Sequence, residues 1–124
     1  MKTVLVVEDM KDYSDCLELI LSQKGYKVVT AANGAEGLEK AKSVKPDLIL
    51  MDIFMPDQDG GETVLKIKSD SSLRNIPIIF LTALASGSGS DSDPIVVDGQ
   101  EYPAISKMAD KEEIIKKVGE YLHS

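Results

Sequence analysis

The strongest constraint on the fold of this chain is a short run of apolar residues that ends in a single aspartate. The run is Leu48-Ile49-Leu50-Met51, and Asp52 follows it directly. It does not alternate between apolar and polar residues, which is typical of a strand buried on both faces of a parallel sheet. Asp52 then falls at the carboxyl end of a central strand, where α/β sheets bind their ligands. From this stretch alone, Asp52 could equally well only begin a turn. The residues at the ends of the other strands are needed to distinguish the two interpretations.

Further apolar runs occur before and after this stretch, and helical patterns separate them. Besides 48–51, strands are predicted at 4–7, 27–31, 78–81 and 103–106. Apolar residues recur at helical spacing within 13–21, 35–41, 64–68 and 114–122. A chain that alternates in this way forms a parallel sheet with helices on both faces, so we predict a doubly wound α/β fold.

The helical spacing also predicts helix starts and the side chains that face the core. Asn33 with Glu36, and Asp110 with Glu113, have the spacing of capping boxes at the start of two helices. We expect Cys16, Ala35 and Tyr121 to lie on the buried faces of their helices.

Composition narrows the class of protein. A chain of 124 residues is long enough for one domain, 1–124, with a substantial core. The net charge of -7 argues against nucleic acid and an anionic membrane as partners. The only cysteine, Cys16, cannot form an internal disulfide, and no apolar run is long enough for a signal peptide or a membrane span. We therefore expect a cytoplasmic protein.

Residues 84–102 interrupt the alternation of strands and helices. The tract at 86–94 consists mainly of glycine, serine and aspartate, which disfavour a helix. Its composition fits a natural flexible loop and an engineered linker equally well. After it, Asp98-Gly99 within 95–102 predicts the turn of a small β-hairpin.

Polar side chains suited to phosphate chemistry follow four of the predicted strands. They are Glu8 and Asp9, then Asp52, Thr82 and Lys107. Carboxyl ends of parallel strands meet at one edge of a sheet, so these side chains are expected to converge there. Three carboxylates repel one another unless a hard cation such as Mg²⁺ lies between them. Thr82 and Lys107 suit phosphoryl oxygens, so the set predicts a phosphoryl-transfer site.

These residues occur within motifs that resemble a known family. The motifs are Val-Val-Glu-Asp at 6–9, Gly-Tyr-Lys-Val-Val at 25–29, Pro46 to Pro56, Asp59-Gly60, and Ile76 to Ala83. Together, in this order and spacing, they resemble the response-regulator receiver domain of two-component signalling, the CheY-like superfamily. The resemblance implies a flavodoxin-like, five-stranded parallel sheet of order 2-1-3-4-5. It also implies one receiver domain over 1–124, with 84–102 as an irregular insertion.

The resemblance implies a role for each carboxylate. Asp52 would accept a phosphoryl group from a sensor histidine kinase or a phosphotransfer protein. Asp9 would bind Mg²⁺, or Mn²⁺, directly, and Glu8 would bind it through water. Asp52 and the backbone carbonyl of Phe54 would complete the protein ligands.

The resemblance also implies roles for the remaining site residues and for the whole chain. Thr82 would hydrogen-bond a phosphoryl oxygen, and Lys107 would pair with the phosphoryl group. The chain would be a regulatory phosphoacceptor rather than an enzyme. It would relay its signal by contact with a downstream protein that the sequence does not identify.

The sequence departs from the family pattern in three places. The Gly-Ser tract stands where the family has its fourth helix, so we expect that helix to be missing or replaced by a loop or hairpin. Ala104 occupies the position of the family's switch aromatic, and Tyr102 lies two residues too early. Met108 replaces the proline that usually follows the lysine. These departures concern the output of the signal rather than phosphorylation.

Two rival functions remain open at this point. The departures favour a pseudo-receiver, an interaction module that does not depend on phosphorylation. A Mg²⁺-dependent phosphohydrolase acting on small molecules is the second rival. Against the hydrolase, Phe54 stands where such an enzyme needs a second aspartate as general acid.

Overall fold

The computed structural model describes residues 2–53, 60–82, 95–97 and 99–122. The helices are α1 (Lys11–Ser22), α2 (Gly34–Val44), α3 (Gly60–Lys68) and α4 (Lys111–Leu122). The strands are β1 (Thr3–Val7), β2 (Lys27–Ala31), β3 (Leu48–Asp52), β4 (Ile78–Thr82), β5 (Ile95–Val97), β6 (Gln100–Tyr102) and β7 (Ala104–Ser106). None of the described helices has the length and apolar character that crossing a membrane requires.

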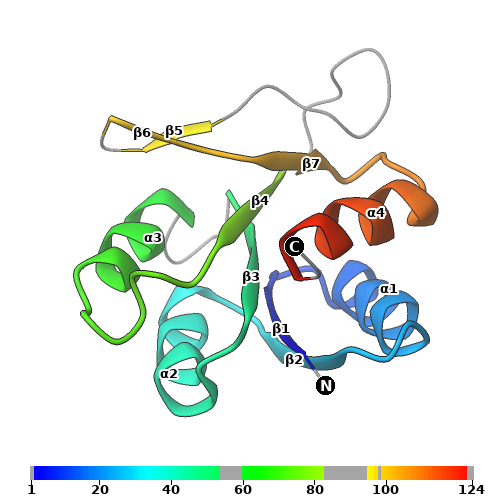
Figure 1. Cartoon of the computed structure of the whole chain (residues 1–124), viewed down its shortest axis with the longest axis horizontal. Helices are drawn as coiled ribbons and strands as arrows, with labels where there is room; N and C mark the ends of the chain where they lie inside the picture. Colours follow the sequence, from blue (N-terminus) through cyan, green and yellow to red (C-terminus); the bar gives the residue numbers. More distant parts are fainter. Residues whose placement is uncertain (1, 54–59, 83–94, 98, 123–124) are drawn as a thin grey trace.

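Five strands form a parallel sheet in the order β2-β1-β3-β4-β7. Because β7 is the last strand of this sheet along the chain, the order is the predicted 2-1-3-4-5. Figure 1 shows α2 and α3 on one side of the sheet and α1 and α4 on the other. The predicted flavodoxin-like fold is confirmed.

The central strands are buried on both faces, as their uninterrupted apolar runs predict. Successive side chains of a strand point to opposite faces. Accordingly, Leu5, Ile49 and Phe80 belong to one apolar cluster, which includes Val64 and Ile67 of α3. Their strand neighbours belong to a second cluster, which includes Leu17 of α1 and Val118 of α4.

Both predicted capping interactions are present. Asn33 Oδ1 accepts a hydrogen bond from the Glu36 amide at 2.8 Å, and Asp110 Oδ1 accepts one from the Glu113 amide at 3.0 Å. Each satisfies an amide that the first turn of a helix would otherwise leave unpaired.

A β-hairpin, rather than a helix, occupies the described part of the chain between β4 and β7. Strands β5 and β6 pair antiparallel, and Gly99 adopts a φ of +80° at the predicted turn. Tyr102 anchors the hairpin, because its buried ring packs edge-on against Phe80 with the ring centroids 5.7 Å apart. Ile95 and Val97 pack against the cluster on the α2–α3 side. The hairpin therefore covers part of the sheet face on the side of α2 and α3. It occurs in the part of the chain where the sequence pattern lacks the family's fourth helix. The Gly-Ser tract lies outside the described residues.

Three predictions of burial are wrong. Cys16, Ala35 and Tyr121 are exposed. Cys16 and Tyr121 each lie one residue, or about 100° around the helix, before a buried leucine. In α2 the sheet side is lined by glycines, so Ala35 points away from it.

Candidate functional site

The alternation of strand side chains brings three of the predicted site residues to one face of the sheet. Glu8, Asp52 and Lys107 continue the phase of the residues that pack against α1 and α4. The backbone fixes two of them, since the Glu8 amide donates to the Ala31 carbonyl at 3.0 Å and the Lys107 amide donates to the Thr82 carbonyl at 2.8 Å. Glu8 and Lys107 are thus held in the same backbone frame that places Asp52 at the end of β3.

Lys107 makes an ion pair with each of two buried carboxylates. Its Nζ lies 2.6 Å from Glu8 Oε2 and 3.3 Å from Asp52 Oδ2. The side chain of Lys107 is 14% exposed, that of Glu8 0% and that of Asp52 6%, so water screens these charges weakly. The ammonium therefore compensates two carboxylates at once.

Burial and neighbouring charges shift the pKa values of Glu8 and Lys107. Burial raises the pKa of Glu8 above its ordinary value, although Lys107 acts against the rise. Burial also acts to lower the pKa of Lys107, but Glu8 and Asp52 outweigh it and raise that pKa. The two carboxylates thus stabilise the charge of Lys107, whereas at Glu8 the effect of burial exceeds that of the ammonium.

The predicted metal ligands lie together at the same edge. One carboxylate oxygen from each of Glu8, Asp9 and Asp52 falls within 4.8 Å of the others. Glu8 Oε1 accepts a hydrogen bond from the Met10 amide at 3.0 Å. The buried Oε2 has only the ion pair with Lys107 among the described residues. Such a set of hard oxygens, with one buried oxygen short of donors, fits a divalent cation such as Mg²⁺. The Phe54 carbonyl lies outside the described residues.

Thr82 is buried at the end of β4, the neighbour of β3 in the sheet. It lies one residue beyond Leu81, which is the register partner of Asp52. The structure therefore places Thr82 beside Asp52 in the sheet and links the Thr82 carbonyl to the Lys107 amide.

The sequence analysis missed Tyr13 as a residue of this site. Its ring faces Lys107, whose Nζ lies 5.3 Å from the ring centroid. The sequence analysis includes Tyr13 only as the first residue of the apolar helical pattern over 13–21. The signal that could have found it is its position in the first turn of α1, immediately after the Glu8-Asp9 strand end.

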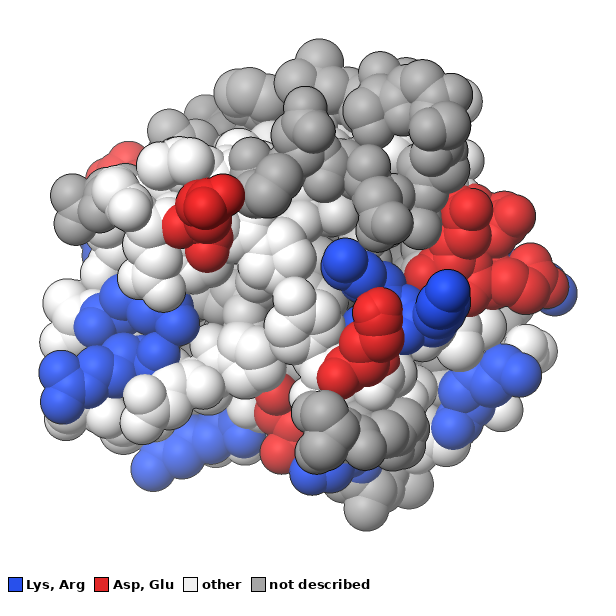
Figure 2. Space-filling view, turned by 45° about the horizontal axis from the view of Figure 1, so that its top comes forward, with Lys and Arg blue, Asp and Glu red and all other residues white. Residues whose placement is uncertain are grey.

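Charged side chains on one outer face of the molecule are mixed in sign. Figure 2 shows acidic and basic side chains interspersed with uncharged ones among the described residues of that face. The described residues of this face form no continuous basic surface of the kind that binds nucleic acid.

The chain matches a model of the response regulator receiver domain over residues 4–119. It is 48% identical over 82 residues to hybrid signal transduction histidine kinase D of Dictyostelium discoideum, which covers 66% of this chain but only 5% of that protein. It is 42% identical over 88 residues to the polar-differentiation response regulator DivK of Brucella anthropi, covering 68% of each chain.

Solved structures with the same fold include one that was determined in complex with Mg²⁺ and BeF. Response regulator TrrA of Thermotoga maritima, solved in complex with Mg²⁺ and BeF, is 31% identical to this chain. The two superpose with a TM-score of 0.79, covering 98% of this chain and 99% of TrrA.

Proposed function

Because the chain belongs to the response regulator receiver domain family of two-component signalling, we propose that Asp52 is its phosphoacceptor. Members of this family are regulatory phosphoacceptors rather than enzymes. One observation carries the choice of Asp52. It is the buried carboxylate at the end of the central strand, 3.3 Å from a lysine and within 4.8 Å of two further carboxylates.

The proposed reaction transfers a phosphoryl group from a phosphohistidine of a sensor histidine kinase or phosphotransfer protein. An oxygen of Asp52 forms the new bond to phosphorus, and the bond from phosphorus to the histidine nitrogen breaks. The leaving imidazole keeps the electron pair of that bond. The product is an acyl phosphate on Asp52.

Glu8 and Asp9, with Asp52, would hold Mg²⁺ or Mn²⁺, with the Phe54 carbonyl as a further ligand. The cation would offset the negative charge of the carboxylates and the phosphoryl group, which otherwise repel each other. TrrA, solved with Mg²⁺ and BeF, supports this assignment by its similarity to this chain.

Lys107 and Thr82 would contact the transferred group. Lys107 already lies against Asp52, so its ammonium needs only a small movement to pair with a phosphoryl oxygen. The Thr82 hydroxyl would donate to another oxygen from the adjacent strand. Neither residue attacks phosphorus; both stabilise its charge.

The partner would dock beside the site, on the surface between α1 and α4. A groove of about 490 Å³ opens there, and Cys16, Leu19 and Ile20 line it together with Lys107. Leu19 in this groove and Met108, which follows Lys107 in the chain, are 60% and 78% exposed, which suits apolar contact with a kinase or phosphotransfer protein. Histidine kinases take their phosphoryl group from ATP, which is found in the cytoplasm. The proposed location of this protein is therefore cytoplasmic.

The signal would leave through the hairpin to a downstream protein that is not identified. Strand β6 runs through Pro103 into β7, and Lys107 follows the end of β7. A shift of Lys107 or Thr82 on phosphorylation would therefore act on a segment continuous with the hairpin. Adding beryllofluoride with Mg²⁺ should change amide exchange in β5 and β6; unchanged exchange there would contradict this route.

Incubation with acetyl phosphate and Mg²⁺ tests the proposed function. We expect a stoichiometric, acid-stable and base-labile adduct of one phosphoryl group that Asp52→Ala abolishes. Asp12→Ala is the matched control, because Asp12 is exposed on α1, and it should keep the adduct. No adduct would favour a pseudo-receiver, and continuous release of phosphate would favour a phosphohydrolase. Either result would overturn the proposal.

A further inference from the structure

Tyr13 combines two features that packing alone does not explain. It lies in the first turn of α1, and its ring faces the ammonium of Lys107, with 5.3 Å between Nζ and the ring centroid. An ammonium within about 6 Å of a ring centroid is attracted by the electron-rich face of the ring. Tyr13 is therefore the third partner of Lys107, after Glu8 and Asp52.

The hydroxyl of Tyr13 is the second feature. Its Oη is buried and has no hydrogen-bond partner among the described residues. Burial raises the pKa of Tyr13, and the charges of Glu8 and Asp52 add to the rise, so the group stays neutral. An unpaired buried hydroxyl destabilises the folded state, whereas leucine or methionine would fill the position without one. Stability alone thus does not favour a tyrosine at this position.

From this geometry we propose that Tyr13 is a positioning residue that keeps Lys107 beside Asp52 when the charges of Glu8 and Asp52 are taken up by another cation. The inference rests on the proposed function of Asp52. In the structure the two carboxylates hold the ammonium. A divalent cation bound to these carboxylates competes for that attraction and repels the ammonium. The uncharged ring is not weakened in this way, so it retains Lys107 at the site.

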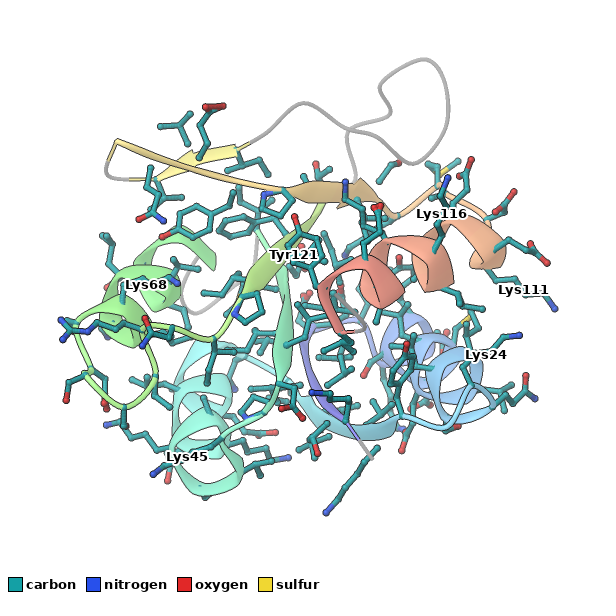
Figure 3. All side chains as sticks on the ribbon, viewed as in Figure 1. Lys24, Lys45, Lys68, Lys111, Lys116 and Tyr121 are labelled. Carbon is teal, nitrogen blue, oxygen red and sulfur yellow. The ribbon has the colours of Figure 1, made fainter. Side chains whose placement is uncertain are left out.

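The first arm of the test measures the position of Lys107 directly by NMR. The ring should shift the side-chain methylene protons of Lys107 upfield relative to those of Lys111, which lies at the exposed start of α4 (Figure 3). We expect the shift to persist with Mg²⁺ and beryllofluoride in the unaltered protein and in Tyr13→Phe. It should disappear in Tyr13→Leu and in Tyr13→Met. Tyr121→Leu, at the exposed end of α4, is the matched control and should keep it.

The second arm measures the rate at which acetyl phosphate and Mg²⁺ form the acyl phosphate. A cation–π contact of ordinary strength corresponds to a rate loss of roughly 2- to 30-fold in Tyr13→Leu. Tyr13→Phe should keep most of the rate, because it keeps the ring. In a Lys107→Met background, Tyr13→Leu should cause no further loss, since its effect acts through Lys107.

The two arms separate failure of the inference from failure of the proposed function. If the unaltered protein forms no acyl phosphate, the proposed function fails, while the NMR arm still decides whether Tyr13 holds Lys107. The inference is overturned if the methylene shift survives in Tyr13→Leu and Tyr13→Met. It is also overturned if Tyr13→Leu slows the reaction equally with and without Lys107.

Discussion

Replacing Lys107 by methionine should destabilise the metal-free protein at neutral pH, because it removes the cation between two buried carboxylates. The Lys107 ammonium lies 2.6 Å from Glu8 and 3.3 Å from Asp52. Without it, two carboxylates face each other where water screens little. Removing one partner of a buried ion pair usually costs several kcal/mol, mostly because the remaining charge is left uncompensated.

Protonation of Glu8 sets a ceiling on this cost. Its ordinary pKa is 4.5, so keeping the carboxyl protonated at pH 7 costs about 3.5 kcal/mol at roughly 1.4 kcal/mol per pH unit. The variant cannot lose more than this through Glu8, because protonation relieves the repulsion. Methionine also avoids the desolvation of the ammonium. We therefore expect a loss of about 1–3 kcal/mol in the free energy of unfolding at pH 7.

The loss should depend on pH with a defined sign. Burial raises the pKa of Glu8, so its contribution to stability is fully present below about pH 4.5 and decreases as the pH rises through the raised pKa. Without Lys107 that pKa rises further and the decrease becomes steeper. At pH 4.5 the variant should lose less stability than at pH 7, since Glu8 is then largely protonated and Lys107 has one carboxylate fewer to compensate.

Urea unfolding in the presence of a chelator, at pH 7 and pH 4.5, measures both values. Lys111→Met is the matched control, because Lys111 is exposed and should change stability by less than about 0.5 kcal/mol. A loss of the same size at both pH values would refute the electrostatic reasoning. So would a Lys107 variant that is no less stable than the Lys111 variant at pH 7.

Three further predictions address the metal, the packing of α2 and the hairpin. Asp9→Asn should barely change the stability measured in chelator, because Asp9 is exposed. It should reduce the rise in melting temperature that Mg²⁺ causes, and an undiminished rise would argue against Asp9 as a ligand. Gly37→Ala should lower the free energy of unfolding by about 1–2 kcal/mol. The added Cβ would lie 2.7 Å from a Val7 methyl, and this clash exceeds the gain in helix propensity. An unchanged melting temperature would contradict this prediction. Tyr102→Leu should lower the free energy of unfolding by about 2 kcal/mol, because the contact with the Phe80 ring is lost. It should speed amide exchange in β5 and β6 more than in β1. Uniform acceleration would mean that Tyr102 does not anchor the hairpin.

The sheet was predictable because its signal is simple and repeated. Strands buried on both faces need uninterrupted apolar runs, and parallel strands need crossover helices between them. Helix faces were less predictable at their borders. Cys16 and Tyr121 fit an apolar pattern, but each lies about a third of a turn from the buried stripe. Ala35 was misassigned because glycines, not apolar side chains, allow α2 to approach the sheet.

The acidic part of the site was predictable for a related reason. Carboxyl ends of parallel strands share an edge, so Glu8, Asp9 and Asp52 had to come close once the strands were assigned. The contact between Tyr13 and Lys107 was not predictable in this way. It depends on how closely α1 approaches the end of β7, which neither periodicity nor strand order determines. The roles of these residues, and one domain over 1–124 with an insertion at 84–102, stay predictions.

The most direct test of the central claim locates the phosphoryl group chemically. After reaction with acetyl phosphate and Mg²⁺, borohydride reduces an aspartyl phosphate to homoserine, and tandem mass spectrometry of peptides identifies the position. The account predicts homoserine at position 52, dependent on Mg²⁺, with Asp9 and Asp12 unchanged. Homoserine at Asp9 or Asp12 instead of Asp52, or none from a protein that remains folded, would contradict it.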